Sequence, residues 1–566
     1  MRDSSFGRWD TPMRGDRLLA EVAGGDRARL GLVLLTALTA TTAGLLLPGA
    51  LAGAVDAAIS GQRSWPQVLL LLGLGALDIT ADVLGGLLTV AVTSTATAAL
   101  RRRLTRHLLG LGTRSRFADG DAISRLTGDC VSAGSVASIL VQLGSAACLS
   151  VGAIVLLAVL DWRLALVFLG SVPIALWLAR SHLRNTADDV LTYQRVSGEI
   201  SARLLDAVRG LRTIAASGTA DRETRRVLRP LPELGKAGSG MWQTQARMIW
   251  RAALLLPAVE VAVLIAAGFG VLNGRLSVGD VLAALGYVAL GMGLVGQIPL
   301  LTTLARARSC AQRISEVLDE PLPHRGRADV RPGPGSVELR RVTVPGALSE
   351  VDLTIPGGTF LAVVGKSGSG KSALVGVVGG LIRPEEGRVL LDGVSTGRLR
   401  PEVLRYYVAY AFERPALLGG TVAEAVSYGT WAGEIAVRNA CRAAQVHDLV
   451  VRLPDGYRTP LAETPLSGGE AQRLGLARAI VRNPRVLVLD DATASLDTVT
   501  EVRVDEAIET ALPGRTRLVV THRAGTAARA DLVAWLENGR VRAVGPHDVL
   551  WREPGYRAVF TEEAEQ

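Results

Sequence analysis

The stretch Thr359-Phe-Leu-Ala-Val-Val-Gly-Lys-Ser-Gly-Ser-Gly-Lys-Ser372 runs from an apolar, strand-like segment straight into a glycine-rich loop. Its last eight residues match GxxxxGK[ST], with a predicted strand before and a predicted helix after them. Glycines let backbone N–H groups converge on phosphate oxygens, and the following helix N-terminus adds a favourable dipole. Lys371 is expected to reach the outer phosphates and Ser372 a magnesium ion. The predicted phosphate-binding residues are Gly365, Lys366, Ser367, Gly368, Ser369, Gly370, Lys371 and Ser372.

A second apolar strand ends on two adjacent carboxylates, in Arg485-Val-Leu-Val-Leu-Asp490-Asp491. A strand-terminal Asp of this kind holds magnesium through water in phosphate-loop proteins, so we predict Asp490 as a magnesium ligand. Short apolar strands alternate with charged helices throughout residues 336–566, which predicts an α/β nucleotide-binding domain there. A Pro/Gly-rich segment predicts a linker before it, over residues 306–335.

The part of the chain before the linker contains long apolar runs with almost no charge. A bilayer's hydrocarbon core needs about 20 mostly apolar residues per helix. These runs are too many for a water-soluble core to bury, so we predict a transmembrane domain over residues 30–305, after a cytoplasmic segment at 1–29. Its six expected spans are about 30–55, 67–92, 136–160, 163–180, 252–272 and 278–301.

The 566-residue chain has a formal net charge of +9, and arginine supplies nearly all of its basic character. Arginines gather in the two long connections at 101–125 and 184–229. Because cytoplasmic loops carry the Lys/Arg excess, both termini and the nucleotide-binding domain are expected in the cytoplasm. This charge favours contact with anionic lipid of the bilayer, and we expect no nucleic-acid partner. The four widely spaced cysteines indicate neither a zinc site nor a disulfide framework.

Three further motifs surround the strand that ends at Asp490. They are Leu466-Ser-Gly-Gly-Glu-Ala-Gln-Arg473, Ala494-Ser-Leu-Asp497 and Val519-Val-Thr-His-Arg523. In order and spacing they resemble the LSGGQ signature, the D-loop and the switch histidine of the ABC transporter superfamily. With the six-span domain ahead of them, nearly the whole chain is similar to an exporter-type half-transporter. The resemblance implies a multi-domain fold: an all-α six-helix transmembrane domain, followed by an α/β P-loop ATPase domain with a helical subdomain.

The resemblance also implies an activity and partners. The chain is expected to be a multi-pass ABC-type ATPase of the cell membrane, a translocase that uses ATP and Mg²⁺. Such half-transporters act as dimers, in which each ATP lies between one chain's phosphate loop and the other chain's signature. Ser467, Gly468 and Gly469 would therefore serve the partner's ATP, because a helix N-terminus suits an anion. Asp497 would contact the other chain, and His522 would act in catalysis.

Three departures from the family pattern concern the chain's own ATP site. A Glu normally follows the strand-end Asp and polarises the attacking water, but here Asp491 is shorter by one methylene, or about 1.5 Å of reach. The loop that usually carries a Gln ligand of magnesium has Glu413, whose carboxylate can still coordinate the metal. The aromatic residue that normally stacks on adenine is missing after Val344, where Pro345 and Gly346 follow.

The signature itself departs only at Glu470, where the family has Gln, so the changes concentrate on one side of the dimer. This asymmetry resembles heterodimeric exporters in which one site binds ATP and hardly hydrolyses it. The sequence favours a heterodimer in which a second half-transporter supplies the catalytic Glu. A homodimer with slow turnover through Asp491 remains open.

The expected function is ATP-driven export of a small peptide, a natural product such as an antibiotic, or another amphipathic compound. A mainly regulatory ATP-binding half, a lipid flippase and an importer of the same architecture are the alternatives. Asp78 and Asp82 lie one helical turn apart in the second span, where ionisable groups are costly. They could bind a cationic or peptide substrate, or pair with arginine at an interface. Glu260 and Gln297 are weaker candidates of the same kind.

Overall fold

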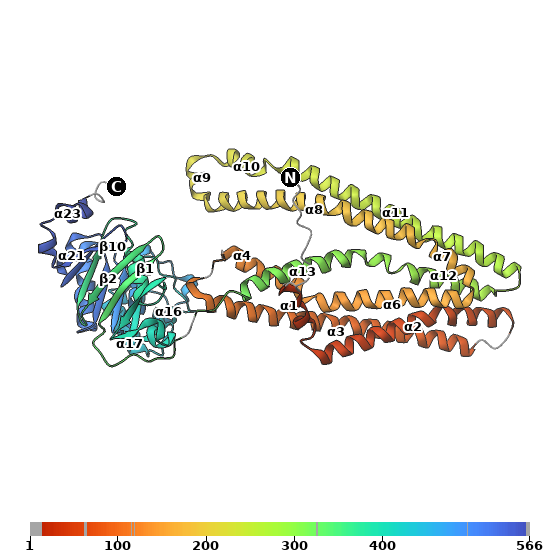
Figure 1. The fold of residues 1–566 in the computed structure, drawn as a ribbon, viewed down its shortest axis with the longest axis horizontal. Coiled ribbons are helices and arrows are strands. Elements are labelled where there is room, and N and C mark those ends of the chain that lie inside the picture. The colour runs from red at the N-terminus through yellow and green to blue at the C-terminus, as the bar shows by residue number, and fades with distance from the viewer. Residues whose placement is uncertain are drawn as a thin grey trace. The chain divides into compact units, whose positions relative to one another are not determined.

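The computed structural model describes residues 14–61, 65–114, 116–117, 119–323, 326–494 and 496–561. The chain divides into two compact units, one of Met1–Gly110 with Arg116–Pro321 and the other of Leu111–Ser115 with Leu322–Gln566. The first unit is helical and the second contains the β-sheets (Figure 1). Residues 1–13 of the expected N-terminal segment, and Ser495 of the expected D-loop, lie outside the described residues.

Long helices that pack along one another form the first unit (Figure 1). α8 packs along α11, and α12 packs against α2, α6 and α11. The described helices are α1 (Arg14–Ala23), α2 (Arg27–Ile59), α3 (Trp65–Leu111), α4 (Asp119–Ser124), α5 (Cys130–Gly134), α6 (Val136–Leu160), α7 (Trp162–Leu169), α8 (Val172–Arg209), α9 (Leu211–Ser217), α10 (Ala220–Leu228), α11 (Leu231–Leu272), α12 (Val278–Met292) and α13 (Ile298–Leu318). α3, at 47 residues, is about 70 Å long and extends well beyond a bilayer's hydrocarbon core.

Four described helices are long and apolar enough to cross a bilayer. They are Arg27–Ile59, Trp65–Leu111, Gly120–Leu160 and Leu254–Leu272. Two shorter apolar helices, Trp162–Ile174 and Val278–Met292, occupy the positions of the expected fourth and sixth spans. The helical unit therefore supplies apolar helices at all of the positions where the sequence predicts spans.

The spans expected at 163–180 and 278–301 are each divided in the structure. In the first, α7 ends before Gly170, and α8 begins with a proline in its first turn, which has no N–H to donate. In the second, α12 is followed by a 3₁₀ turn at Val295–Gln297, because glycines at 291, 293 and 296 weaken the helix there.

Helix α13 continues into the stretch 306–335 that the sequence indicates as a linker. Residues 306–318 form its C-terminal part, where Ala311, Ile314 and Val317 are completely buried. This face packs against α1 and α5, so burial of apolar side chains stabilises a helix that precedes the Pro/Gly segment.

Apolar side chains cover much of the surface of α2 and α3. Leu35, Leu38, Ile79 and Leu87 are each more than half exposed within the chain. Exposed apolar area costs about 25 cal/mol per Å² in water, and this cost disappears in hydrocarbon. The helical unit is therefore a transmembrane domain.

Two sheets organise the second unit. The described strands are β1 (Val337–Val344), β2 (Leu348–Ile355), β3 (Phe360–Val364), β4 (Glu386–Leu391), β5 (Val394–Ser395), β6 (Val408–Phe412), β7 (Val486–Asp490), β8 (Thr516–Val520), β9 (Leu532–Glu537) and β10 (Arg540–Gly545). The smaller sheet has the order β2-β1-β4-β5 and is antiparallel. The larger has the order β10-β9-β3-β8-β7-β6 and is parallel except for β10.

Helices and apolar cores lie on both faces of the larger sheet. The described helices are α14 (Lys371–Val378), α15 (Pro401–Tyr407), α16 (Val422–Ser427), α17 (Glu434–Ala443), α18 (His447–Val451), α19 (Gly468–Ile480), α20 (Thr498–Ala511), α21 (Ala524–Arg529), α22 (His547–Leu550) and α23 (Pro554–Thr561). β3 is buried at every residue, as a parallel strand between two layers must be. Helices α16 to α19 form the helical subdomain. The predicted fold class is confirmed.

Candidate functional site

The predicted site residues gather at one edge of the larger sheet. β3, β8 and β7 are parallel neighbours, so their carboxyl ends meet at the same edge, where open α/β sheets usually bind ligands. β3 leads into the glycine-rich loop, β7 ends on Asp490, and β8 leads to His522. β6, the next strand beyond β7, leads to Glu413. The sheet order thus brings together residues that are far apart in the sequence.

Lys371 is the first residue of α14, and its side chain is buried in the phosphate loop. Its Nζ donates hydrogen bonds to the carbonyl oxygens of Gly365 at 2.7 Å and Lys366 at 3.1 Å. The loop therefore holds a positive charge beside a helix N-terminus, and both favour a bound anion. The residues fit the outer phosphates of a nucleotide.

Gly370 shows why this loop needs glycine. Its φ of +98° is a left-handed conformation that side chains with a Cβ rarely adopt. An added Cβ would also collide with the carbonyl oxygen of Ala347, in the turn between β1 and β2. This turn therefore lies against the phosphate loop. Its described residues, Pro345, Gly346 and Ala347, include no aromatic side chain.

Two predicted magnesium ligands contact each other. Ser372 Oγ donates a hydrogen bond to Asp490 Oδ1 at 3.1 Å. Burial raises the pKa of the Asp490 carboxyl; the hydrogen bond from Ser372 opposes that effect, and the charges of Asp491 and Glu413 add to it. A divalent cation would relieve this concentration of negative charge. Among the residues that the structure describes, no group of three or more His, Cys, Asp or Glu side chains could hold a metal by itself.

The predicted water-activating carboxylate and the switch histidine are neighbours. Oδ2 of Asp491 lies 3.5 Å from Nε2 of His522, and both side chains are partly exposed. The backbone of Asp491 is left-handed, with a φ of +50°. The Asp491 side chain is one methylene shorter than that of a Glu. Its carboxylate therefore reaches less far toward a water at the phosphate loop.

Glu413 lies at the expected edge of the sheet, with its main chain fixed by the helical subdomain. Gln472 Nε2 donates to the carbonyl oxygen of Glu413 at 2.7 Å. The Glu413 side chain is about half exposed and lies 3.8 Å from the Arg414 guanidinium. Its carboxylate is therefore near enough to raise the pKa of Asp490 while it remains open to solvent.

The signature segment forms the start of α19. Ser467 is the N-cap, and its Oγ accepts a hydrogen bond from Glu470 N at 3.3 Å. In return, the Glu470 carboxylate accepts from Ser467 N at 2.7 Å, and this bond lowers the pKa of Glu470. The two bonds form a capping box, with Gly468 and Gly469 in the first turn. The Glu that replaces the family's Gln therefore stabilises the helix start.

Asp497 of the D-loop is the N-cap of α20. Its Oδ2 accepts a hydrogen bond from Thr500 N at 3.0 Å. The carboxylate that the sequence assigns to a contact with a second chain is thus also used within its own chain, to start a helix.

Comparison with known proteins identifies the family. Residues 30–295 match the model of the ABC transporter transmembrane region, and residues 348–494 match the ABC transporter model. The chain is 43% identical over 562 residues to the ABC transporter ATP-binding protein RamA of Streptomyces coelicolor. The aligned region covers 97% of this chain and 88% of that protein. This chain belongs to the ABC transporter family. Its ABC domain makes this transporter an ATPase.

Other relatives of this ABC transporter carry different names. The rat ABC-type oligopeptide transporter ABCB9 is 30% identical over 518 residues, or 87% of this chain and 66% of that protein. An ATP-dependent lipid A-core flippase of Pseudomonas fluorescens is 29% identical over 416 residues, or 70% of this chain and 68% of that protein. A bacterial Atm1-family ABC exporter, solved with ATP bound, has the same fold, with a TM-score of 0.82 at 24% identity over 96% of this chain and 99% of that chain. The recognised architecture of a transmembrane domain fused to an ATPase domain is confirmed.

Sequence reasoning assigned no role to Tyr410, Glu501 or Arg523. The Tyr410 hydroxyl accepts from Gly379 N at 2.8 Å and donates to the carbonyl oxygen of Val375 at 2.6 Å, which anchors the end of α14 behind the phosphate loop. A tyrosine within an apolar strand is a usable signal, because a buried hydroxyl needs partners. For Arg523, the only signal in the sequence is its place after the switch histidine.

Proposed function

We propose that this ABC transporter is one half of a heterodimeric exporter, whose own ATP site binds ATP and hydrolyses it slowly. The observation that carries the proposal is Asp491, which lies 3.5 Å from His522 on a side chain one methylene short. Misplacing a catalytic group by about 1 Å costs on the order of a hundredfold in rate. The exposed Glu413 and the β1–β2 turn without an aromatic ring support a site better suited to holding ATP than to turning it over.

The signature segment also supports a heterodimer in which the two ATP sites differ in their rate of hydrolysis. Ser467 and Glu470 make both bonds of the capping box, so the helix start that would face the partner's ATP is well formed. This chain would thereby complete the partner's site, where the partner's Glu activates water. The alternative is that this chain is mainly a regulatory ATP-binding half. The two proposals differ only in how much of the transport is driven by ATP at this chain's own site.

Exposed apolar side chains at the far end of α8 and in α9 support a dimer. Leu204, Leu205, Val208 and Leu211 are each half or more exposed. Leu204 lies roughly 50 Å along the helix from Val172, which is farther than the 30 Å or so of a bilayer's hydrocarbon core. Lipid tails therefore do not explain this exposure, whereas a second half-transporter would cover it.

ATP and Mg²⁺ fit the site as follows in this proposal. Lys371 would hold the outer phosphates, and Ser372 with Asp490 would hold the magnesium ion. Magnesium is usually bound by one or two carboxylates together with substrate phosphates, which suits a site with few protein ligands of its own. The arginine-rich connections at 101–125 and 184–229 support a cytoplasmic position for the termini and the ATPase domain.

A largely apolar cavity of about 780 Å³ in the transmembrane domain, with two carboxylates in its lining, supports export of a cationic amphipathic compound, such as a small peptide. Asp78, Asp82 and Gln297 all line it, between α2, α3 and α6, whereas Glu260 is not among its lining residues. No arginine or lysine is among the lining residues, so the two carboxylates have no cation beside them in the described cavity. Carboxylates within a membrane-spanning helix favour a positively charged group.

Measuring ATP turnover by the purified full chain in lipid nanodiscs tests the proposal. We expect the chain alone to bind ATP and to release phosphate no more than a few-fold faster than its Asp491→Asn variant. Brisk hydrolysis that Asp491→Asn abolishes would instead establish a working homodimer.

A further inference from the structure

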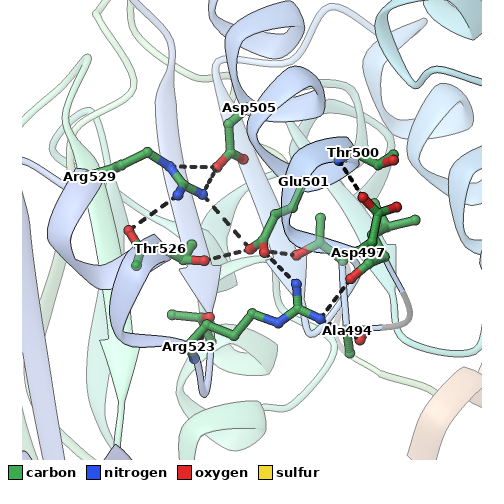
Figure 2. A network of polar contacts seen from close by, with 12 residues as sticks. Ala494, Asp497, Thr500, Glu501, Asp505, Arg523, Thr526 and Arg529 are labelled. Carbon is green, nitrogen blue, oxygen red and sulfur yellow. Dashed lines mark hydrogen bonds and ion pairs between the residues drawn. The ribbon is translucent and has the colours of Figure 1, made fainter.

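A buried carboxylate connects two separate segments of the ATPase domain (Figure 2). Glu501, in the first turn of α20, is only 2% exposed. It pairs with the guanidinium of Arg523 and accepts a hydrogen bond from Thr526 Oγ1, and Arg529 lies 3.9 Å away. A buried charge is stable only when partners surround it, so these side chains fix one another's positions.

Arg523 extends this connection to the backbone before α20. One arm of its guanidinium, Nη1, pairs with Glu501. The other arm, Nη2, donates to the carbonyl oxygen of Leu496 at 2.7 Å and to that of Ala494 at 3.0 Å. A planar fork with several N–H donors can make these bonds together, whereas the single ammonium group of a lysine cannot span the same positions.

The two connected segments belong to different parts of the ATP machinery. Arg523 directly follows His522, which lies 3.5 Å from Asp491 at the chain's own phosphate site. Ala494 and Leu496 precede Asp497 in the D-loop, the segment that would face the second chain. A movement of the His522 segment therefore acts directly on the D-loop backbone through the Arg523 guanidinium, while a side-chain path runs from Thr526 through Glu501 to Thr493, whose Oγ1 lies 3.5 Å from Glu501 Oε1.

We propose that Arg523, anchored by Glu501, is a positioning residue that couples the segment of His522 to the backbone of Ala494 and Leu496, ahead of Asp497. The proposal deepens the proposed function and rests on it, because the D-loop acts on the other site only in a dimer. Nucleotide bound at this chain's own site thereby sets the conformation of the segment offered to the partner's site. A site that holds ATP without much turnover can regulate its partner in this way.

Hydrogen–deuterium exchange on the full chain in nanodiscs, with and without MgATP, tests the coupling. In the wild type, MgATP should slow exchange in peptides that cover both 492–500 and 519–524. In Arg523→Lys the second peptide should stay protected, while the first loses its protection by about tenfold or more, because a lysine cannot replace the charge-assisted hydrogen bonds that the guanidinium donates to the D-loop backbone. Protection that is equal in wild type and Arg523→Lys would overturn the proposal.

Arg529→Lys is the matched control. Arg529 pairs with Asp505 at 2.5 Å and also faces Glu501, but its described hydrogen bonds go to Asp505 and to the carbonyl oxygen of Gly525. Exchange at 492–500 should be unchanged in this variant. An equal loss in Arg529→Lys would show that any weakening near Glu501 loosens the D-loop, which would also overturn a specific role for Arg523.

A second variant keeps the test valid where Arg523→Lys folds poorly. Glu501→Gln preserves the size of the side chain and an oxygen for Thr526, but it removes the charge that anchors Arg523. The D-loop should again lose its MgATP protection, and retention would contradict the anchoring. Exchange is read on one chain and needs no hydrolysis, so its outcome is independent of whether Asp491 supports slow or brisk turnover.

Discussion

Replacing Asp491 by Glu should restore hydrolysis at this chain's own ATP site. The substitution adds one methylene, or about 1.5 Å of reach beyond the position beside His522. Because a misplacement of about 1 Å costs on the order of a hundredfold in rate, we expect a gain of up to about a hundredfold. The backbone at this position is left-handed, with a φ of +50°, which suits the short polar side chain of Asp better than Glu. A stability cost of about 1 kcal/mol is therefore expected with the gain.

The assay is phosphate release by the full chain, taken from the fraction in which two copies associate in nanodiscs. Its near-intact signature lets each copy complete the other's site under those conditions. Adding His522→Ala to Asp491→Glu should remove the gain, because the histidine fixes the position of the carboxylate. ATP affinity and melting temperature report whether each variant is folded. An Asp491→Glu chain that is folded, dimeric and binds ATP, but hydrolyses it no faster than wild type, would refute the reasoning.

Three further predictions concern other parts of the molecule. Glu470→Ala should lower the stability of the ATPase domain by about 1 kcal/mol, measured as a lower melting temperature, because it removes half of the capping box, whereas Glu470→Gln retains an acceptor and should cost less. Pro345→Tyr should tighten binding of ATP and GTP alike by fivefold or more, since stacking contributes about 1–3 kcal/mol per base. If Pro345→Leu binds nucleotide as tightly as Pro345→Tyr, stacking is excluded as the cause. The double variant Asp78→Asn with Asp82→Asn should weaken binding of a cationic amphipathic peptide by about tenfold, which corresponds to about 1.4 kcal/mol. Glu260 is not among the residues that line the cavity, so Glu260→Gln should leave the affinity unchanged. An equal loss of affinity in the double variant and in Glu260→Gln would contradict a substrate role for the cavity.

The sequence predicted well those features that depend only on a short stretch of chain and on the bilayer or ligand that this stretch contacts. Apolar runs of membrane length reveal a transmembrane domain, because a helix must be mostly apolar over about 20 residues to cross the hydrocarbon core. The phosphate loop is equally local, since Gly370 and Lys371 act through conformation and position within one turn of chain. Parallel strands then bring Asp490 and His522 to the same edge of the sheet.

The features that the sequence could not reveal depend on contacts between distant residues. The division of the spans at 163–180 and 278–301 reflects glycines and prolines whose effect is decided by packing in the tertiary structure. Nothing near Glu501 indicates that it is buried, or that its partner Arg523 also bonds to Ala494. Long-range hydrogen bonds of this kind have no periodic pattern in a sequence.

The most direct test of the central claim is the fate of the nucleotide on this chain. The full chain, purified from its native membrane with whatever half-transporter accompanies it, is incubated with a photoreactive ATP labelled on either the α- or the γ-phosphate, and each chain is then examined for retained label. We predict that this chain retains the γ-phosphate label about as well as the α-phosphate label, because it holds ATP, whereas the accompanying chain retains only the α-phosphate label. Loss of the γ-phosphate label from this chain at the same rate as from the other would contradict the account.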